Sequence, residues 1–304
     1  MRVLHFAGLL SVLFFSINDA KSTAAISPTR KLSAEDLMRI RASTDAKQST
    51  IVQWEGQVLS YKPGEQPKVT FNVLGMNIAR AVKMADGTYD LLSREFQLYL
   101  DPVTDKVINV WQNPYSGKKV PVVHVANNPV YQSFPPGQQY VAKSRPGRLY
   151  TLQLSIPLSY PNSLNPTGDL NSPFFPYSGT QKLAAIESFT FTFPASEISG
   201  KSKSLPSTQV YWTRTSALLP WMATPNTNTT LLFIGNGAKV AGGWKNLNPV
   251  LRDVVKKILP AYKEAPLART SPGGGVSSWS YFAQPEVFQA YLNGSIFPLR
   301  DDKK

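Results

Sequence analysis

The sequence has 304 residues and no cysteine, and its 32 Lys and Arg against 19 Asp and Glu give a formal net charge of +13. The lack of cysteine excludes disulfides, thiolate metal sites and cysteine nucleophiles. Because the cations are scattered and form no recognisable nucleic-acid module, we expect no nucleic-acid partner, and the basic surface favours solubility or a weak attraction to anionic surfaces.

The first 25 residues predict a secretory signal peptide. One cation, Arg2, precedes an apolar run over residues 3–15, and small and polar residues follow. That run is shorter than the ~20 apolar residues of a membrane-spanning helix, although an uncleaved N-terminal anchor is the alternative. We therefore expect a secreted protein whose mature chain begins between Lys21 and about Ser27.

Two Asn-x-Ser/Thr tripeptides agree with passage through a secretory pathway. They begin at Asn228 and Asn293, and both are expected to be glycosylated. After the signal peptide, the pattern predicts a leader segment over residues 26–47, a single β-rich domain over 48–293 and a tail over 294–304. The leader contains a short predicted helix at 34–40, with Ser33 as its N-cap.

Apolar and polar residues alternate with a period of two from Ile51 onward, which is typical of strands with one buried face. Turn residues separate the segments, and short turns between successive strands favour an antiparallel meander. We expect residues 51–126 to form one meander with Trp54, Phe71, Phe96 and Leu98 turned toward one core. The six predicted strands begin at Ile51 and continue with 69–73, 78–84, 89–100, 107–112 and 120–126.

The second half is less regular. Further strands are predicted at 149–156, 189–193, 210–214 and 231–234, and helices at 250–259 and from Pro285 to about residue 293. A long loop, 157–179, carries several aromatic residues and is either a lid or a strap packed over one end of the sheet; the strap is favoured. The predicted fold class is mainly β, an antiparallel meander curled into a barrel or half-barrel with a few peripheral helices.

Several sequence blocks resemble the family catalogued as domain of unknown function 1838. The most specific lies within residues 94–130, and later blocks lie at 212–214, 219–222, 260–266 and 277–282. The resemblance covers about residues 48–290 and implies secretion and a shared fold without supplying a reaction.

Two positions depart from the pattern of that family. Its members tend to have Asp where this chain has Asn128, and a glycine-containing turn at 225–228. If the Asp orients His124 in relatives, the resemblance implies that this chain has altered or lost their activity.

The chemistry that the residues can support is restricted, because His124 is the only histidine after the signal region. A His/Cys-type zinc site cannot be built, and we expect no metal and no cofactor. A Ser-His-Asp triad around His124 is formally possible, but the chain has no Gly-x-Ser-x-Gly elbow. Phosphate-binding glycine motifs are also missing.

Polar residues interrupt apolar strand faces at Arg80, Arg94 and His124. These three side chains are expected to point inward and to share one surface, with Asn127 and Asn128 at its edge. A buried charge must be paired, and the local candidates are Glu95, Asp90 or Asp101. Structural ion pairs, or arginines that reach solvent at strand ends, are the alternative.

Three hypotheses of different class follow. The first is a secreted barrel-like protein that binds an apolar or amphipathic small molecule, with Arg80, Arg94, Glu95, Asn127 and Asn128 at the polar end of the ligand. The second is an isomerase, cyclase or hydrolase that uses His124 as general acid or base on such a molecule. The third is a structural or glycan-binding secreted protein. The sequence does not predict the oligomeric state.

Overall fold

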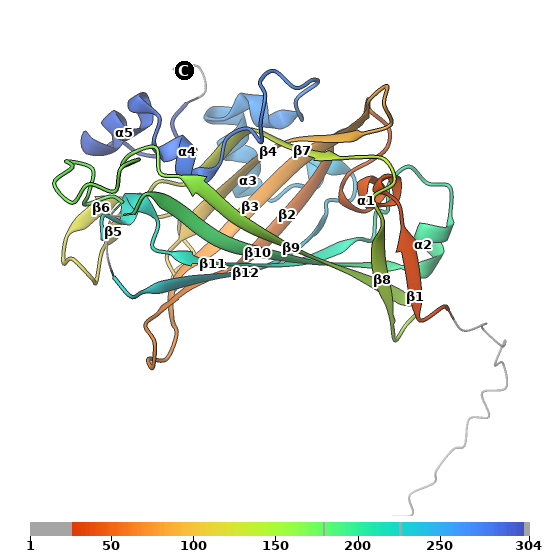
Figure 1. The fold of residues 1–304 in the computed structure, drawn as a ribbon, viewed down its shortest axis with the longest axis horizontal. Coiled ribbons are helices and arrows are strands. Elements are labelled where there is room, and N and C mark those ends of the chain that lie inside the picture. The colour runs from red at the N-terminus through yellow and green to blue at the C-terminus, as the bar shows by residue number, and fades with distance from the viewer. Residues whose placement is uncertain (1–25, 179, 225–226, 301–304) are drawn as a thin grey trace, which may run out of the picture.

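The fold is built on one strongly curled antiparallel sheet (Figure 1). The computed structural model describes residues 26–178, 180–224 and 227–300, so the predicted signal peptide lies outside the described residues. In order across the sheet, its ten strands are β1 (Thr29–Leu32), β8 (Tyr140–Arg145), β9 (Leu149–Pro161), β10 (Lys182–Pro194), β11 (Gln209–Ala217), β12 (Thr230–Lys239), β2 (Thr50–Tyr61), β3 (Lys68–Lys83), β4 (Tyr89–Leu100) and β7 (Val125–Phe134).

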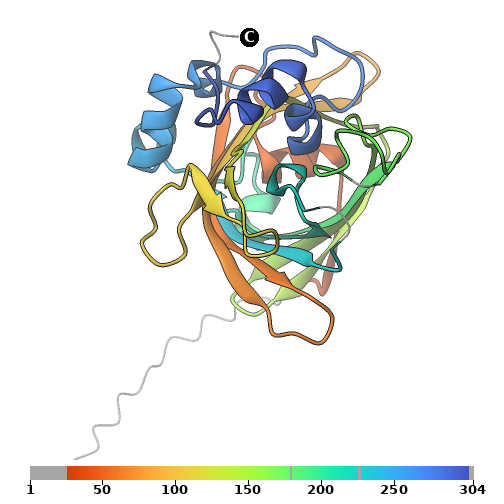
Figure 2. The ribbon, with the colours of Figure 1, turned by 90° about the vertical axis from the view of Figure 1, so that its left-hand side faces the viewer.

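Seen from one end, the strands curl around a common interior, with β1 and β7 as the two edges of the sheet (Figure 2). The predicted class, a mainly β antiparallel half-barrel with a few helices, is confirmed. A separate small hairpin pairs β5 (Val110–Gln112) with β6 (Lys119–Pro121).

Short helices cover the ends and one outer side of the sheet. They are α1 (Ala34–Arg41), α2 (Ala195–Ser199), α3 (Pro249–Lys257), α4 (Ser278–Phe282) and α5 (Pro285–Leu292), with 3-10 turns η1 (Pro220–Met222), η2 (Gly243–Asn246) and η3 (Pro260–Lys263). Among the described residues, no helix is long and apolar enough to cross a membrane.

The helices predicted from capping residues are confirmed. The Ser33 side chain accepts a hydrogen bond from the Asp36 amide, and the Asp36 carboxylate accepts one from the Ser33 amide, so a capping box starts α1. At the start of α3 the Asn248 side chain accepts a hydrogen bond from the Val250 amide, and Pro249 occupies the first position of the helix.

Strand alternation divides the side chains into an inner and an outer face, and both faces are packed. Inside, one cluster around Phe71 and Trp221 fills the end under α4 and α5, and another around Met38 and Phe193 fills the end that contains α1. Outside, a third cluster packs residues of β3 and β4 beneath Leu251 and other residues of α3 and η3.

This second, outer core corrects the prediction that four large residues share one core. Trp54 and Phe71 do face the interior, but Phe96 and Leu98 lie on the outer face beneath α3. Alternation assigns residues to a face, yet it does not show that a helix covers the outer face as well.

The meander over β2, β3 and β4 is confirmed, but two of its predicted strands are one. β3 runs through Gly75 without a break, because the Trp54 indole lies against that glycine, where a Cβ atom would come within 2.4 Å of the ring. Strands form within the predicted segments 107–112 and 120–126 as β5 and β6, but the prediction that they continue the meander is wrong: both leave the main sheet, and the next strand beside β4 is β7.

The segment predicted as a leader is built into the half-barrel. β1 pairs with β8, and Leu37 and Met38 of α1 are fully buried. The Lys239 ammonium of β12 donates to the carbonyl oxygens of Arg39 and Ala42, at the last turn of α1. The segment predicted as a tail is also packed into the fold, because Phe297 is buried in the interior cluster around Phe71 and Trp221.

The long loop after β9 packs as a strap. Rings of Phe174 and Tyr177 lie 5.3 and 5.1 Å from the ring of Phe288 on α5. The side chain of Asn162 donates to Ser178 Oγ, and that of Asn165 donates to the Ser178 carbonyl, which ties the two ends of the loop together. This geometry agrees with the favoured interpretation of the loop.

Candidate functional site

Arg80 lies on the outer face of the sheet and serves as a structural clamp. Its guanidinium donates to the carbonyl of Ala46 (2.5 Å) and to Ser49 Oγ (3.3 Å), which fixes the connection between α1 and β2. Ser49 Oγ also accepts from the Ala265 amide. Arg80 therefore faces away from the interior in which a ligand was expected.

Arg94 shares that outer face with Phe96 and Leu98, as the alternation predicted. Its Nε donates to Asn128 Oδ1 at 2.8 Å, and its Nη1 donates to the Glu264 carbonyl. The arginine therefore joins β4 and β7 to the segment after η3. Because Asn128 is engaged here, it does not orient His124, and an Asp at this position would meet a guanidinium rather than an imidazole.

His124 is enclosed in the packed end of the interior, between β6 and β7. Its Nδ1 accepts a hydrogen bond from the Tyr99 amide at 3.0 Å, so the proton of the neutral ring resides on Nε2. Nε2 has no hydrogen-bond partner among the described residues, and the neighbouring cavity of about 10 Å³ has room for about one water. Burial lowers the pKa of His124 to about 3, so the ring is neutral near pH 7.

The prediction of one inward surface made by Arg80, Arg94 and His124 is therefore wrong. The two arginines hold covering segments on the outer face, while the histidine packs beside Tyr99 with its ring 5.9 Å away. The physical reason is that helices cover the outer face of β3 and β4. Because both faces of these strands carry apolar residues, the sequence pattern does not show which face points to the interior.

Glu95 and Asn127 do come together, inside the half-barrel. They are cross-strand partners on β4 and β7, and the Asn127 side chain donates to Glu95 Oε1 at 2.7 Å. Asn127 is 4% exposed, and its own Oδ1 has no hydrogen-bond partner within the described part of the chain. The Asn127 carbonyl oxygen, which accepts no hydrogen bond within the described residues, and the Glu95 carboxylate thus both face the interior.

An ion pair that the sequence reasoning missed faces the same space. Arg214 of β11 and Glu187 of β10 are cross-strand partners, 3.3 Å apart between Nη1 and Oε1, with side chains 12% and 19% exposed. The guanidinium also lies over the Trp279 ring of α4, 4.7 Å from its centroid. Arg214 Nε and Nη2 are buried and lack a hydrogen-bond partner among the described residues.

Arg41, at the end of α1, contributes a second cation. Its Nη1 donates to Gln132 Oε1 of β7 at 2.5 Å. Burial lowers the pKa of Arg41 to about 10, and the nearby Tyr140, Glu95 and Glu187 act in the opposite direction. Near neutral pH the guanidinium therefore stays charged.

We define Arg41, Glu95, Glu187 and Arg214 as the interior charge cluster. Burial raises the pKa of Glu95, while the hydrogen bond from Asn127 and the charge of Arg214 oppose the shift. The pKa of Glu187 is also raised by burial and by the charge of Glu95, again against Arg214. Each carboxyl thus binds its proton more tightly than an exposed glutamate does.

Aromatic side chains form the walls between these charges. Trp54 Nε1 donates to Gln97 Oε1 at 2.8 Å, and the Trp212 ring lies 5.8 Å from that of Phe233. Unlike the two packed ends, the middle of the interior is lined by partly accessible inward side chains: Trp54, Asn77, Glu95, Leu154, Ile156, Glu187, Phe189, Trp212 and Arg214. These side chains are therefore less completely buried than those of the two packed ends.

A family model described as protein of unknown function (DUF1838) matches residues 47–286. The chain belongs to the DUF1838 family. The matched region runs from just before β2 into α5, so it contains Glu95, Glu187 and Arg214 but not Arg41. No match was found among curated proteins.

Two signals in this DUF1838 chain could have located the missed pair. The alternation of Phe with Thr over residues 189–193 places Glu187 on the same face as Phe189 when it is extended by one step. Arg214 lies within residues 212–214, one of the sequence blocks that resemble the family. The pairing itself depends on the register of β10 and β11, which the sequence does not specify.

The two predicted glycosylation positions are accessible in the DUF1838 fold. Asn228 is exposed just before β12, and Asn293 is exposed at the end of α5. Neither lies at the interior charge cluster.

Proposed function

We propose that this DUF1838 protein binds an amphipathic small molecule in the middle of its half-barrel. The observation that supports the proposal is the combination of partly accessible aromatic and charged side chains between two packed ends. Ligand sites of soluble proteins are commonly lined by apolar and aromatic side chains with a few convergent polar groups, and this interior carries both kinds of side chain.

The polarity of the interior suggests how such a ligand lies. Arg214 offers two guanidinium nitrogens without partners in the described chain, and Asn127 offers a carbonyl oxygen. A carboxylate, sulfonate or hydroxyl at one end of the ligand satisfies these donors, while the apolar part contacts Trp212 and Phe189. Binding thereby removes the cost of leaving buried polar atoms unpaired.

Titration with anilinonaphthalene sulfonate, an amphipathic anion, tests the proposal. Arg214→Met is expected to raise its Kd by about tenfold or more, because a charge-assisted hydrogen bond is lost. Arg145→Met, on an exposed position of β8, is the matched control and should leave the Kd unchanged. Equal affinity of the wild type and a folded Arg214→Met variant would overturn the proposal.

A second candidate is an enzyme that uses carboxyl chemistry at the same place. The interior brings together Glu95 and Glu187, whose pKa values are both raised and which influence each other electrostatically. Such a pair can divide the roles of acid and base. If turnover of a bound molecule is found, Glu95→Gln should abolish it while binding is retained, and His124→Gln should not.

We also propose that the protein is a secreted glycoprotein, on the basis of the exposed sequons at Asn228 and Asn293. Digestion with an N-glycosidase should lower the mass of protein collected from the medium, and Asn228→Gln with Asn293→Gln should remove the shift. N-terminal sequencing of that material should begin between Lys21 and about Ser27. An unchanged mass, or a chain beginning at Met1, would contradict this proposal.

A further inference from the structure

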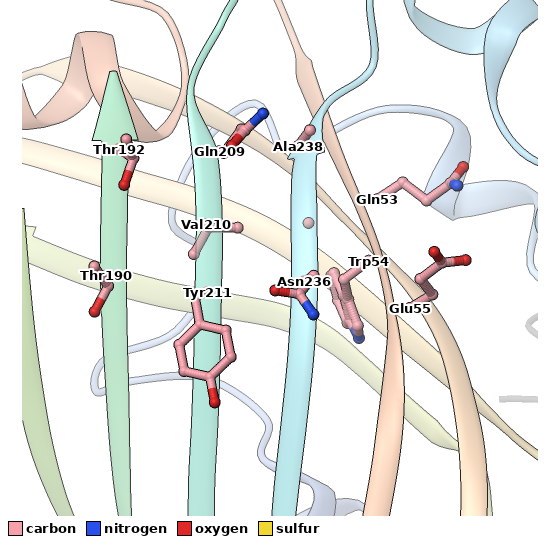
Figure 3. Close-up of a pocket in the computed structure, with 11 residues that line it drawn as sticks. Gln53, Trp54, Glu55, Thr190, Thr192, Gln209, Val210, Tyr211, Asn236 and Ala238 are labelled. Atoms are coloured by element: carbon pink, nitrogen blue, oxygen red, sulfur yellow. The ribbon is translucent and has the colours of Figure 1, made fainter. Parts of the chain in front are cut away.

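The outer face of the sheet carries a shallow groove of about 430 Å³ that crosses β10, β11, β12 and β2 (Figure 3). Its outward side chains lie on the other face of the sheet from the interior charge cluster, because successive residues on a strand face opposite sides: Tyr211 points outward where its neighbour Trp212 points inward. Trp54 and Val210, whose side chains lie on the inner face, also border the groove. The groove is therefore a second surface with its own chemistry.

Polar side chains cross the groove in register. Asn236 on β12 pairs with Tyr211 on β11 and with Glu55 on β2, so hydrogen-bonding groups line up on adjacent strands. Since neighbouring strands lie about 4.8 Å apart, four strands span ~14 Å, which suits an extended ligand lying across the strands. The complete row is Thr190, Tyr211, Asn236 and Glu55.

A second row lies two residues along each strand. It consists of Thr192, Gln209, Ala238 and Gln53, again as successive cross-strand partners. The two rows together form a ladder of hydroxyl and amide groups, with the Glu55 carboxylate at one end of the first row and Ala238 as the one apolar member of the second. Such groups both donate and accept hydrogen bonds.

The charge of the groove argues against an anionic ligand. Although the chain contains 32 Lys and Arg, no lysine or arginine lines the groove, and Glu55 is its single charged side chain. A site for sulfated or phosphorylated molecules would need cations. The surface therefore does not match an anionic ligand, and its one carboxylate leaves most of the ladder neutral.

Tyr211 supplies a flat, accessible ring in the middle of the ladder. Tyr211 is 44% exposed, and within the described part of the chain its ring pairs with no other aromatic ring. On either side, Thr190 and Asn236 present polar atoms. A ring beside hydroxyl and amide groups suits a ligand that has an apolar C–H face and an edge of hydroxyl groups.

We propose that this groove binds an uncharged oligosaccharide that lies across the strands, with one sugar ring stacked on Tyr211. The hydroxyl groups of a sugar are donors and acceptors at once, as the ladder requires, and its ring has an apolar face. The proposal does not depend on a ligand inside the half-barrel.

Isothermal titration of the full chain with cellohexaose, xylohexaose and chitohexaose tests this proposal, and a hyaluronan oligosaccharide serves as an anionic comparison. We expect at least one neutral hexaose to bind. Tyr211→Ala should raise its Kd by about tenfold or more. Thr213→Ala, on the same strand and face but outside the groove, is the matched control, and Arg214→Met should leave this affinity unchanged.

Three results would overturn the proposal: no binding of any neutral hexaose, binding only of the hyaluronan probe, or neutral binding that a folded Tyr211→Ala variant retains in full. Analytical ultracentrifugation adds a further check. A wild-type dimer that Tyr211→Ala dissociates would show that the groove contacts a second copy of the chain instead.

Discussion

His124 shows how a residue that is chemically prominent in the sequence becomes structural in the fold. Its Nδ1 accepts from the Tyr99 amide, and burial lowers its pKa to about 3 from an ordinary 6.5. Between these values the unfolded chain takes up a proton that the folded chain does not, so folding stability falls as the pH is lowered from 6.5 toward 3. Above pH 6.5 the contribution of the neutral ring is fully present.

We therefore predict that His124 makes acid conditions destabilising by up to about 1.4 kcal/mol per pH unit in this window. His124→Gln keeps an acceptor for the Tyr99 amide but cannot titrate, so its free energy of unfolding should depend less steeply on pH. Urea unfolding of both proteins between pH 7 and 4 measures the two slopes. Parallel slopes would show that the ring is accessible and titrates normally.

Arg94 is a second residue that was predicted to bind a ligand and has a structural role in the fold. Its guanidinium donates to Asn128 and to the Glu264 carbonyl on the outer face. Arg94→Met should lower the free energy of unfolding by about 2 kcal/mol, since hydrogen bonds to a charged group are lost. Chemical denaturation measures this cost, and anilinonaphthalene sulfonate should still bind with its wild-type affinity. If the variant lost its affinity for anilinonaphthalene sulfonate but kept its stability, Arg94 would be a ligand-binding residue instead.

At the scale of elements, α3 explains why the outer face of β3 and β4 is apolar. Leu251 and Val255 are buried against that face, whereas Val250 on the same helix is 45% exposed. The helix thus converts an outer surface into a second core.

Paired substitutions test this packing. Leu251→Ala should cost about 3 kcal/mol of unfolding free energy, because a buried leucine leaves a cavity. Val250→Ala, one residue earlier and largely exposed, should change it by less than about 0.5 kcal/mol. Thermal or urea unfolding gives both values, and equal costs would mean that α3 is not docked as described.

The elements that the sequence predicted best are those with strong local signals. The capping residues Ser33 and Asn248 marked the starts of α1 and α3 correctly, and alternation located β2, β4 and the strands of the second half. The continuity of β3 was not predicted: residues 69–73 and 78–84 were expected as two strands, and Gly75 lies in the gap between them, where the Trp54 ring occupies the space that a side chain would take. Local pattern carries no information on such a contact between strands.

At the scale of the whole molecule, the sequence did not predict the order of the strands in the sheet or which face of the sheet is covered by helices. The sheet brings β2 between β12 and β3, and residues as distant as Arg41, Glu95 and Arg214 thereby face one interior. Of the predicted ligand-binding residues, Glu95 and Asn127 face this space, whereas Arg80, Arg94 and Asn128 lie on the outer side. Alternation could group residues by face, but only the tertiary arrangement shows which face encloses the space.

The central claim is that the middle of the half-barrel, beside the interior charge cluster, is a ligand site. A crystal structure of the protein soaked with anilinonaphthalene sulfonate tests it most directly, since it locates the probe without assuming an affinity. We predict electron density for the sulfonate next to Arg214 and for the aromatic rings against Trp212, between the two packed ends. Density found only on the outer face, or an interior closed by its own side chains, would contradict the account.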